Sequence, residues 1–366
     1  MKIALIVPGF SSNEQDWCIP ALLDYVRALS RTDEVHVFTL RWPEWNARYS
    51  VFGADVWALG GRARLGPRVV GLWARALGAI SAEHRRAPFD VLHAFWADEP
   101  GWVAALAGAR LRRPVLLSLA GGELVGLADI GYGLQRLPGR RALVRWLMRR
   151  AALVTGGSDY LLGLARAHLP GRQQHRLRRA PLGVDLTRFT PGAAPANDHV
   201  IGLNVGALYP VKDQALLLRA LARLPETVSV RIAGQGPLLA QLQGLAAGLG
   251  LAARVQFLGP VDHGALPAVY AGASVFVQTS RHEAQGMALL EAAACGVPAV
   301  GTPVGVLPEV GLPAADEATL AETLGGLLGD PARRKALGQA ARERVEEEFS
   351  LEGTMRRFRA LYGEVA

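Results

Sequence analysis

Residues 275–301 read VFVQTSRHEAQGMALLEAAACGVPAVG, and this stretch decides the fold. The apolar, β-branched run at Val275–Thr279 predicts a strand, and residues Gly286–Cys295 predict a short apolar helix. Gly296 is typical of a helix end, and Ala299–Gly301 predicts the next strand. A strand, a helix and a strand in this order form the repeating unit of a parallel α/β sheet.

The same alternation extends along the chain in both directions. Further strands are expected at Lys2–Val7, Glu34–Leu40, Val91–Ala94, Pro114–Leu119, Val154–Gly156, Val200–Val205, Val228–Ala233 and Val255–Phe257. Helices are expected at Ile19–Ser30, Gly101–Gly108, Arg140–Ala152, Gln214–Leu224, Leu238–Leu249 and Leu351–Tyr362. Strands that alternate with crossover helices predict doubly wound parallel sheets.

The chain has 366 residues, more than one hydrophobic core normally serves, so we expect two domains. Residues 191–198 carry no periodic pattern and predict a linker. We therefore expect an α/β protein with two Rossmann-like, doubly wound domains, at residues 1–190 and 199–345, that face each other across a cleft. The last segment, 346–366, is expected to be a helix that packs back toward the N-terminal domain.

Composition and charge narrow the class of protein. Residues 1–196 hold 26 Lys+Arg against 15 Asp+Glu, and the remainder holds 14 against 17, which gives the net charge of +8. A basic half indicates an anionic substrate or surface, and without a recognised binding motif we expect no nucleic acid.

No apolar run approaches the roughly 20 residues of a membrane span, and the N-terminus is typical of a buried strand. We expect a cytoplasmic protein. The two cysteines, Cys18 and Cys295, have no metal-ligand spacing around them.

The turn before the helix at Gly286 is the first candidate site. The first amides of a helix have no partner inside it, and together with the helix dipole they form an anion site. Glu283 precedes this helix, where its carboxylate can reach sugar hydroxyls, and Glu291 lies about one turn further on, where it can hold a ribose. Alternatively, Glu283 complements the dipole and Glu291 is a solvated helix residue. An unpaired carboxylate among so many apolar neighbours would be costly, which favours a role for Glu291.

Two further loops follow predicted strands. Gly206 ends one strand, and the loop after it presents Lys212, one of only three lysines in an arginine-rich chain. A lysine in such a composition indicates a need for a compact ammonium, as at a phosphate, although chance placement is the alternative. The second loop, Ala120-Gly121-Gly122-Glu123, pairs glycines with an acid and would face the cleft. Its alternative is a plain strand-to-helix turn.

Together these residues resemble glycosyltransferase family 4, the retaining enzymes with two Rossmann-like domains (GT-B, glycosyl transferases group 1), over essentially the whole chain. The resemblance is carried by four segments in the family's order: Ala180–Phe189 (APLGVDLTRF), Gly206–Lys212, the E-x7-E pattern from Glu283 to Glu291, and Glu291–Val300 (EAAACGVPAV).

The resemblance implies a retaining hexosyltransferase that uses a nucleotide-diphosphate sugar and an acceptor of small-molecule, lipid-linked or cell-envelope glycan type. It assigns the N-terminal domain to the acceptor and the C-terminal domain to the donor, with no cofactor and no metal. Glu283 and Lys212 would be catalytic. The donor would bind to Gly206, Lys212, Glu283, Gln285, Gly286, Met287 and Glu291. The sugar or acceptor side would be formed by Ala120, Gly121, Gly122 and Glu123.

The chain departs from the family pattern at three places. Ala207 stands where the family usually has arginine, Ala120 where it has histidine, and Asn13–Trp17 replaces an early glycine-rich loop. Two other functions therefore stay open: a sugar-nucleotide epimerase of the same fold, and a non-catalytic sugar-nucleotide-binding protein.

A peripheral contact with an anionic membrane is a separate hypothesis. Residues Gln135–Arg150 mix arginines with Leu143, Trp146 and Leu147 at helical spacing. This pattern is typical of a helix that lies on an anionic bilayer, on the inner face of the membrane in this case. It is equally typical of a helix that packs its apolar stripe inward.

Overall fold

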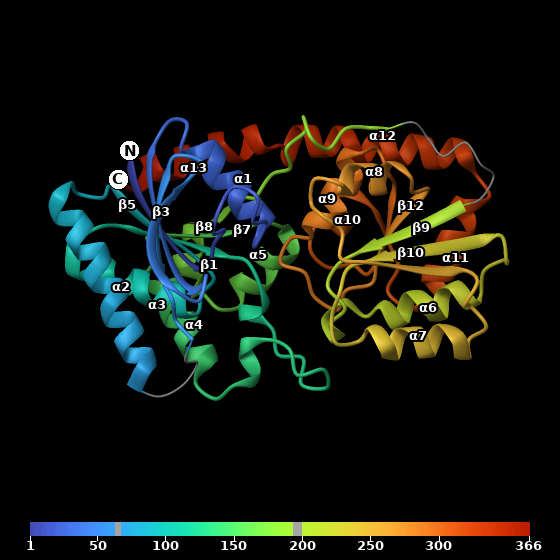
Figure 1. Ribbon diagram of the computed structural model, residues 1–366, viewed down its shortest axis with the longest axis horizontal. Coiled ribbons are helices and arrows are strands. Elements are labelled where there is room, and N and C mark those ends of the chain that lie inside the picture. The colour runs from blue at the N-terminus through green and yellow to red at the C-terminus, as the bar shows by residue number, and fades with distance from the viewer. Residues whose placement is uncertain (63–66, 193–199) are drawn as a thin grey trace. The chain divides into compact units, whose positions relative to one another are not determined.

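The computed structural model describes residues 1–62, 67–192 and 200–366, which form two α/β units (Figure 1). The first unit comprises Met1–Gly183 together with Leu351–Ala366, and the second comprises Val184–Ser350. Of the predicted linker, Pro191 and Gly192 belong to the second unit, and residues 193–198 lie outside the described residues.

The first unit is built on an eight-stranded sheet with the order β3-β4-β2-β1-β5-β6-β7-β8. Its strands are β1 (Lys2–Gly9), β2 (Glu34–Trp42), β3 (Asn46–Val51), β4 (Ala54–Leu59), β5 (Val91–Phe95), β6 (Val115–Leu119), β7 (Leu153–Gly156) and β8 (Leu177–Arg179). The ladders are parallel except that β3 runs antiparallel to β4. β5, β6 and β7 are buried along their whole length, as expected for parallel strands covered on both faces.

Six helices surround this sheet: α1 (Pro20–Leu29), α2 (Pro67–Arg86), α3 (Glu99–Leu111), α4 (Arg140–Arg150), α5 (Asp159–Arg166) and α13 (Leu351–Val365). Short 3-10 turns lie at η1 (Gly122–Leu124), η2 (Leu134–Arg136) and η3 (Gly171–Arg176). In α4, Val144, Leu147 and Met148 are buried, so its apolar stripe packs inward. Arg141, Arg145 and Arg149 are exposed and recur every four residues, so the outer side of α4 is cationic.

The C-terminal helix α13 is held to the first unit by a buried chain of hydrogen bonds. The hydroxyl of Tyr362 lies 2.5 Å from that of Tyr25 in α1 and 2.7 Å from Nδ1 of His93 in β5. The other ring nitrogen of His93 lies 2.7 Å from Ser118 Oγ in β6, which lies 2.6 Å from Thr155 Oγ1 in β7. Burial lowers the pKa of His93 to about 3, so this chain contains a neutral imidazole.

The second unit has a six-stranded parallel sheet with the order β11-β10-β9-β12-β13-β14. Its strands are β9 (Val200–Val205), β10 (Val228–Ala233), β11 (Val255–Gly259), β12 (Val275–Gln278), β13 (Ala299–Gly301) and β14 (Leu312–Pro313). Its helices are α6 (Gln214–Ala222), α7 (Leu239–Gly248), α8 (Leu266–Ala271), α9 (Met287–Ala294), α10 (Leu307–Val310), α11 (Glu317–Leu328) and α12 (Pro331–Glu348), with the 3-10 turn η4 at Pro210–Lys212. This is the doubly wound Rossmann order, which reverses direction between β9 and β12.

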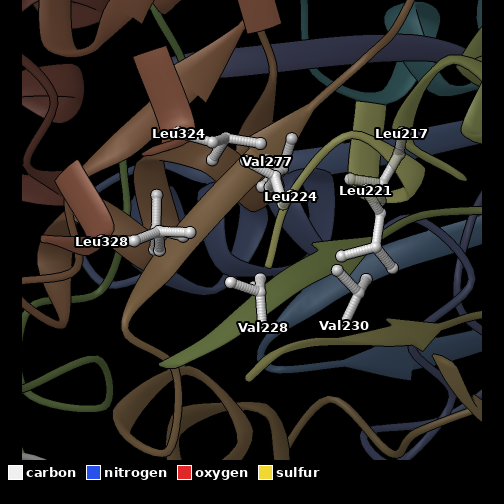
Figure 2. A pocket seen from close by; sticks show the side chains of 10 residues that line it. Leu217, Leu221, Leu224, Val228, Val230, Val277, Leu324 and Leu328 are labelled. Carbon is white, nitrogen blue, oxygen red and sulfur yellow. The ribbon is translucent and has the colours of Figure 1, made fainter. Parts of the chain in front are cut away.

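An apolar cavity of about 10 Å³ lies inside the second unit (Figure 2). Leu217 and Leu221 of α6, Leu324 and Leu328 of α11 and valines of the sheet line it. Its lining contains no polar side chain to bind a water molecule, so we expect a dry packing defect.

No helix in the described parts of the chain, 1–62, 67–192 and 200–366, is both long enough and apolar enough to cross a bilayer.

Candidate active site

The loops that follow β9 and β12 meet at the point where the second sheet reverses its strand order. Ligands of open α/β sheets bind at the carboxyl ends of the strands at such a point. Two hydrogen bonds join the loops: the amide of Arg281 donates to the carbonyl of Val211 at 2.8 Å, and Thr279 Oγ1 donates to the carbonyl of Lys212 at 2.9 Å. The backbone around Lys212 is therefore fixed relative to the loop that carries Glu283.

Lys212 and Glu283 form an ion pair in which Nζ lies 2.5 Å from Oε1. Ser280 Oγ donates a second hydrogen bond to the same carboxylate oxygen at 2.6 Å. The side chains of Lys212 and Glu283 keep 29% and 15% of their surface exposed, so a ligand can reach both. The ammonium is thus held in place by a partner that an anionic ligand can replace.

A small cavity of about 40 Å³ opens beside this pair, and Gly286 and Met287 line it together with Lys212 and Glu283. Helix α9 begins at Met287, and Gly286 in front of it has a φ of +104° and no side chain to cap the helix. This backbone conformation favours glycine. The first amides of α9 have no partner inside the helix, which makes this end of the cavity attractive to an anion.

Gly206 and Gln285, which are also expected to bind the donor, lie in different places relative to this cavity. Gly206 lies against the aliphatic part of Lys212, and its lack of a side chain leaves space there. Gln285 lies outside the cavity lining, where its side-chain amide contacts Met287 Sδ at 3.4 Å. Ala207 is exposed and carries no charge, so the family's arginine has no counterpart at this position.

Glu291 lies apart from the Lys212 cavity. It is 7% exposed, and each carboxylate oxygen has a partner: His263 Nε2 at 3.2 Å and the hydroxyl of Tyr270, which donates at 2.7 Å. Burial and the nearby carboxylate raise the pKa of Tyr270, so its hydroxyl stays protonated. The sequence analysis missed both partners, although the cost of an unpaired carboxylate in an apolar helix indicated that some were needed.

In the first unit, the loop after β6 contains Ala120, Gly121, Gly122 and Glu123, the residues expected on the sugar or acceptor side. The carboxylate of Glu123 is 1% exposed and accepts hydrogen bonds from the amides of Ala97, Ala120 and Gly121 at 3.2, 3.1 and 2.7 Å. Backbone amides in tight loops otherwise lack partners, and the Glu123 carboxylate supplies them. The carboxylate thereby fixes the loops after β5 and β6. The carboxylate of Glu123 is thus engaged within the protein, and the assignment of this loop to the sugar or acceptor side stays a prediction. A Cβ at Gly122 would lie 2.8 Å from the ring of Tyr132, so this glycine permits close packing.

Asp98 is a titratable residue that the sequence analysis missed. It follows β5, next to the point between β1 and β5 where the first sheet reverses its strand order. Burial, followed by the charges of Glu123 and Glu99, raises its pKa to about 7. Its Oδ1 is buried and has no hydrogen-bond partner among the described residues. The loop after β5 thus holds a carboxyl group that titrates near neutral pH.

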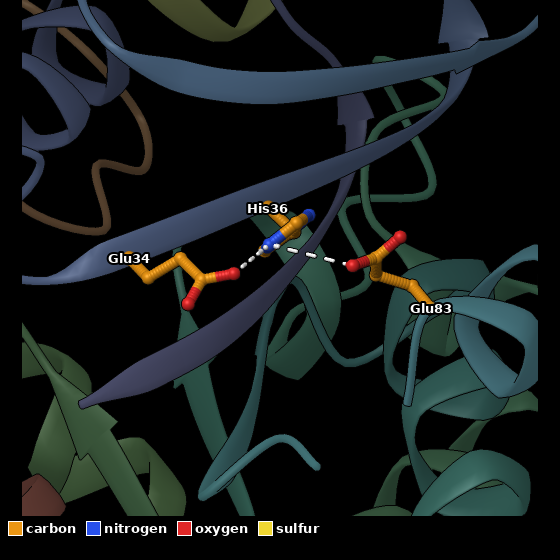
Figure 3. Close-up of side chains that lie close together, drawn as sticks. All are labelled: Glu34, His36 and Glu83. Atoms are coloured by element: carbon orange, nitrogen blue, oxygen red, sulfur yellow. Dashed lines mark hydrogen bonds and ion pairs between the residues drawn. The ribbon is translucent and has the colours of Figure 1, made fainter. Parts of the chain in front are cut away.

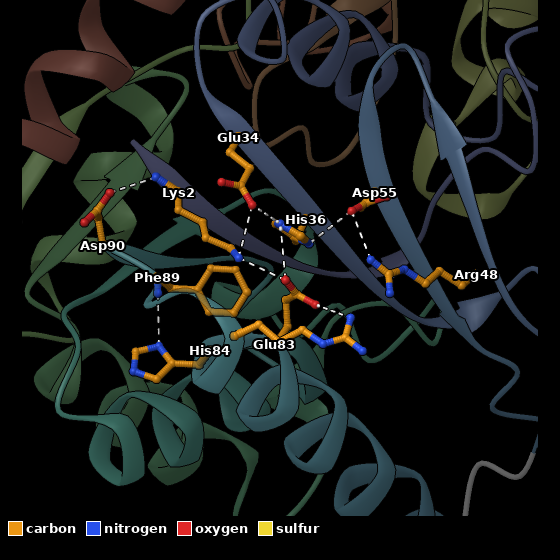
Figure 4. A network of polar contacts seen from close by, with 10 residues as sticks. Lys2, Glu34, His36, Arg48, Asp55, Glu83, His84, Phe89 and Asp90 are labelled. Carbon is orange, nitrogen blue, oxygen red and sulfur yellow. Dashed lines mark hydrogen bonds and ion pairs between the residues drawn. The ribbon is translucent and has the colours of Figure 1, made fainter.

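A cluster of metal-ligating residue types lies at the amino ends of β1 and β2 (Figure 3). His36 Nε2 lies 2.8 Å from Glu34 Oε1 and 4.0 Å from Glu83 Oε1. The ammonium of Lys2 lies 3.1 Å from the Glu34 oxygen and 2.9 Å from the Glu83 oxygen, between the two carboxylates (Figure 4). Because lysine already supplies the positive charge, we interpret this cluster as an ion network in which Lys2, His36 and Glu83 are buried and Glu34 is exposed.

Comparisons with known proteins agree with this geometry. The family model described as Glycosyl transferases group 1 matches residues 191–344, and that of Glycosyltransferase Family 4 matches residues 21–188. A GDP-mannose-dependent alpha-(1-6)-phosphatidylinositol monomannoside mannosyltransferase of Mycolicibacterium smegmatis is 33% identical over 275 residues, and the match covers 67% of this chain and 71% of that protein. A D-inositol 3-phosphate glycosyltransferase of Geodermatophilus obscurus is 33% identical over 254 residues, covering 62% of this chain and 54% of that protein.

Solved structures share the fold of the whole chain. Sucrose-phosphate synthase from Thermosynechococcus elongatus superimposes with a TM-score of 0.80 at 24% identity and covers 100% of this chain and 99% of that one. HepE of Anabaena, solved with UDP and glucose, gives a TM-score of 0.74 at 18% identity and full coverage of both chains.

The chain belongs to the group 1 glycosyltransferases, the family-4 type with two Rossmann-like domains. It is therefore a transferase of the EC 2.4 class that uses a nucleotide-sugar donor, which the epimerase alternative does not fit.

Proposed function

We propose that this enzyme transfers a hexose from a nucleotide-diphosphate donor to its acceptor with retention of configuration and without a metal ion. The observation that carries the proposal is the Lys212–Glu283 pair, 2.5 Å apart, at the cavity in front of α9. A cation, free helix amides and a carboxylate within one small site match the parts of a sugar diphosphate. The cation and the amides fit the phosphates, and the carboxylate fits the sugar hydroxyls.

The chemistry follows from the charges at this cavity. Lys212 and the first amides of α9 stabilise the negative charge that grows on the diphosphate as the glycosidic bond breaks. Because this fixed positive charge is already present, no metal ion is needed to neutralise the leaving group. When phosphate replaces Glu283 as the partner of Lys212, the carboxylate becomes available to hold hydroxyls of the donor sugar. The leaving phosphate accepts the proton of the acceptor hydroxyl on the same face of the sugar, which gives retention.

For Glu291, which the E-x7-E pattern predicts to hold the ribose, the contacts in the structure favour an indirect role. We propose that it positions the nucleotide through the local structure that His263 and Tyr270 maintain, because both of its oxygens already have protein partners. A ribose can bind to Glu291 directly only if it displaces one of these two partners.

We infer that the acceptor is an anionic or lipid-linked polyol or glycan. Residues 1–196 carry an excess of 11 positive charges, the difference between 26 basic and 15 acidic residues, which favours an anionic acceptor. The relative from M. smegmatis is named for phosphatidylinositol monomannoside and that from G. obscurus for inositol 3-phosphate, both phosphorylated inositols. We place the enzyme in the cytoplasm, with electrostatic contact to an anionic membrane through Arg141, Arg145 and Arg149.

A thermal-shift screen against UDP, GDP, ADP and their hexose conjugates tests the donor site. A ligand present at one hundred times its dissociation constant stabilises the folded protein by about 2.7 kcal/mol, which is visible in a melting curve. We expect one nucleotide to raise the melting temperature of the wild type and of the control Lys335→Met, an exposed lysine in α12, but not of Lys212→Met. No shift with any nucleotide would contradict the donor site.

Transfer itself is tested with the donor that the screen identifies. The enzyme is incubated with the labelled conjugate and a panel of inositol phosphates, phosphatidylinositol and simple glycosides, and the anomeric configuration of the product is read by NMR. An α-product from an α-linked donor supports retention. Donor binding without transfer to any acceptor would instead support the non-catalytic binding protein, in line with the substitutions at Ala120 and Ala207.

A further inference from the structure

A second pocket, of about 520 Å³, lies in the first unit at the end of the sheet opposite to the loops after β5 and β6. Val115 and Leu153, the first residues of β6 and β7, line it, so it opens at the amino ends of these strands. The residues that α3 contributes are small: Ala105, Gly108 and Ala109. The volume falls within the range of small-molecule sites, about 300–1,000 Å³.

The charged lining of this pocket is predominantly positive. It consists of Arg113, Arg150, Arg176, Arg178 and Glu364, with His175 beside them. Four guanidinium groups therefore face one carboxylate.

Two of the four arginines have structural partners. Arg178 Nη2 lies 2.5 Å from Oε1 of Glu364, the one carboxylate in the described lining of this pocket. Arg176 Nη1 donates to the carbonyls of Arg149 and Ala151 at 3.0 and 3.3 Å, where α4 ends. A cation at this position complements the negative end of the helix dipole. The ordinary role of stabilising a helix end thus accounts for Arg176 and Arg178.

Arg113 and Arg150 differ from these two because, among the described residues, their guanidinium groups donate to no carbonyl or carboxylate, although Arg150 also lies in the last turn of α4. The side chain of neither forms a hydrogen bond or ion pair within the described ranges 1–62, 67–192 and 200–366. The guanidinium of Arg150 lies 5.4 Å from the centre of the Trp146 ring, which orients the group without neutralising it. A guanidinium group presents two parallel donors that match the oxygens of a phosphate.

We propose that this pocket binds a phosphate-bearing organic ligand, with Arg113 and Arg150 as its principal contacts. Inorganic phosphate alone would fill only a small part of 520 Å³, so the ligand carries an organic group that packs against the small residues of α3. The same phosphate ester chemistry is available from two sources, a soluble phosphorylated metabolite and the headgroup of a phospholipid. The site is separate from the Lys212 cavity and does not depend on the function proposed above.

The experiment separates this pocket from the donor site by using Lys212→Met as the parent protein throughout. The pocket variant adds Arg113→Gln and Arg150→Gln. The control variant instead adds Arg31→Gln and Arg85→Gln, two exposed arginines of the same unit that lie outside the pocket. Glycerol 3-phosphate is titrated by calorimetry, and sedimentation is measured with vesicles of phosphatidylglycerol and phosphatidylcholine and with vesicles of phosphatidylcholine alone.

We expect the pocket variant to bind one of these probes at least tenfold more weakly than the parent, with the control variant unchanged. A pocket-dependent loss for glycerol 3-phosphate identifies a soluble ligand, and a loss confined to the phosphatidylglycerol vesicles identifies a lipid headgroup. Unfolding curves of all three proteins check that the substitutions leave the fold intact, which we expect because neither guanidinium group donates a hydrogen bond or forms an ion pair among the described residues. The proposal is overturned if the parent binds neither probe, or if the two variants lose binding equally.

Discussion

The ammonium of Lys212 lies 2.5 Å from Oε1 of Glu283, although 71 positions separate the two residues in the chain. The contact forms because β9 and β12 are neighbours in the second sheet, and the loops after them are joined by backbone hydrogen bonds. In the unliganded protein the positive charge of Lys212 is therefore compensated internally. If the donor phosphate binds to Lys212 as proposed above, it must compete with Glu283 for this charge.

This competition gives the first prediction, which concerns Glu283→Gln. Removing the carboxylate leaves Lys212 without its charged partner, so we expect free nucleoside diphosphate to bind as tightly as to the wild type, or up to about tenfold more tightly. The sugar conjugate should lose its advantage over the free diphosphate, because the amide is a weaker partner for sugar hydroxyls than a carboxylate. Calorimetric titration with both ligands measures this difference. Equal weakening of both ligands would show that Glu283 acts only by holding the loop.

The buried chain around His93 gives the second prediction. Tyr362→Phe removes the hydroxyl that lies between Tyr25 and His93 and leaves two buried polar groups without this partner. An unsatisfied buried group costs about 1–3 kcal/mol, so we expect the free energy of unfolding to fall by roughly that amount or more. Urea unfolding measures it, with Tyr209→Phe as the control, because Tyr209 is 52% exposed. A loss no larger than that of the control would mean that packing alone holds α13.

The strands of both sheets could largely be predicted from the sequence, because their apolar runs are short and glycine or proline residues bound them. The hairpin β3–β4 was not predicted, because such an apolar run is missing there. Exposed and half-buried residues alternate along most of β3, so no apolar run marks it. Helix α2 was also missed, since Gly71 and Gly78 interrupt its pattern and tertiary packing stabilises it instead.

The buried network at Lys2 gives the third prediction. Burial opposes ionisation of Glu83, but the hydrogen bond and charge of Lys2 outweigh it and lower the pKa of this carboxyl. A lowered pKa in the folded state contributes stability above the range in which an unfolded glutamate titrates, and this contribution is lost as the pH falls through the folded value. Lys2→Met leaves a buried carboxylate without this counter-ion and should cost about 3 kcal/mol at pH 7.

The difference between Lys2→Met and wild type should shrink as the solution is acidified, because Glu83 of the variant then takes up a proton. Urea unfolding from pH 7 to pH 4 follows this change, with Lys335→Met as the control for loss of a lysine charge. A difference that stays constant over this range would show that Lys2 acts through packing rather than through its charge.

The apolar cavity of the second unit gives the fourth prediction. Leu221 is 1% exposed and lines this cavity, so Leu221→Ala enlarges a space that the neighbouring strands cannot close (Figure 2). The lost burial and the larger cavity should together reduce the free energy of unfolding by about 3–5 kcal/mol. Leu249→Ala, at a leucine that is 37% exposed, should cost less than about 1 kcal/mol. Similar losses for the two variants would mean that the unit collapses around the cavity.

The candidate site could be predicted only where local sequence determines it. The start of α9 follows from a strand, a glycine and an apolar helix, and the structure brings Lys212 to the cavity in front of it. The partners of Glu291 could not be located in this way, because His263 and Tyr270 come from other segments and meet it only through tertiary packing. The structural role of Glu123 could not be predicted either, because sequence spacing does not show that three backbone amides surround its carboxylate.

Asp98 gives the fifth prediction, and its sign is opposite to that of Glu83. Burial and the neighbouring Glu123 and Glu99 raise its pKa to about 7, so the folded state binds a proton that the unfolded state releases. The stability contribution of Asp98 therefore falls as the pH rises toward 7 and is constant above it. Asp98→Asn should make the protein more stable than wild type at pH 8, by up to about 2 kcal/mol, and the two should converge near pH 4.

Urea unfolding at these pH values measures the difference, with the exposed Glu14→Gln as the control. If Asp98→Asn is instead less stable at pH 8, the ionised carboxylate has a stabilising role in the loop after β5.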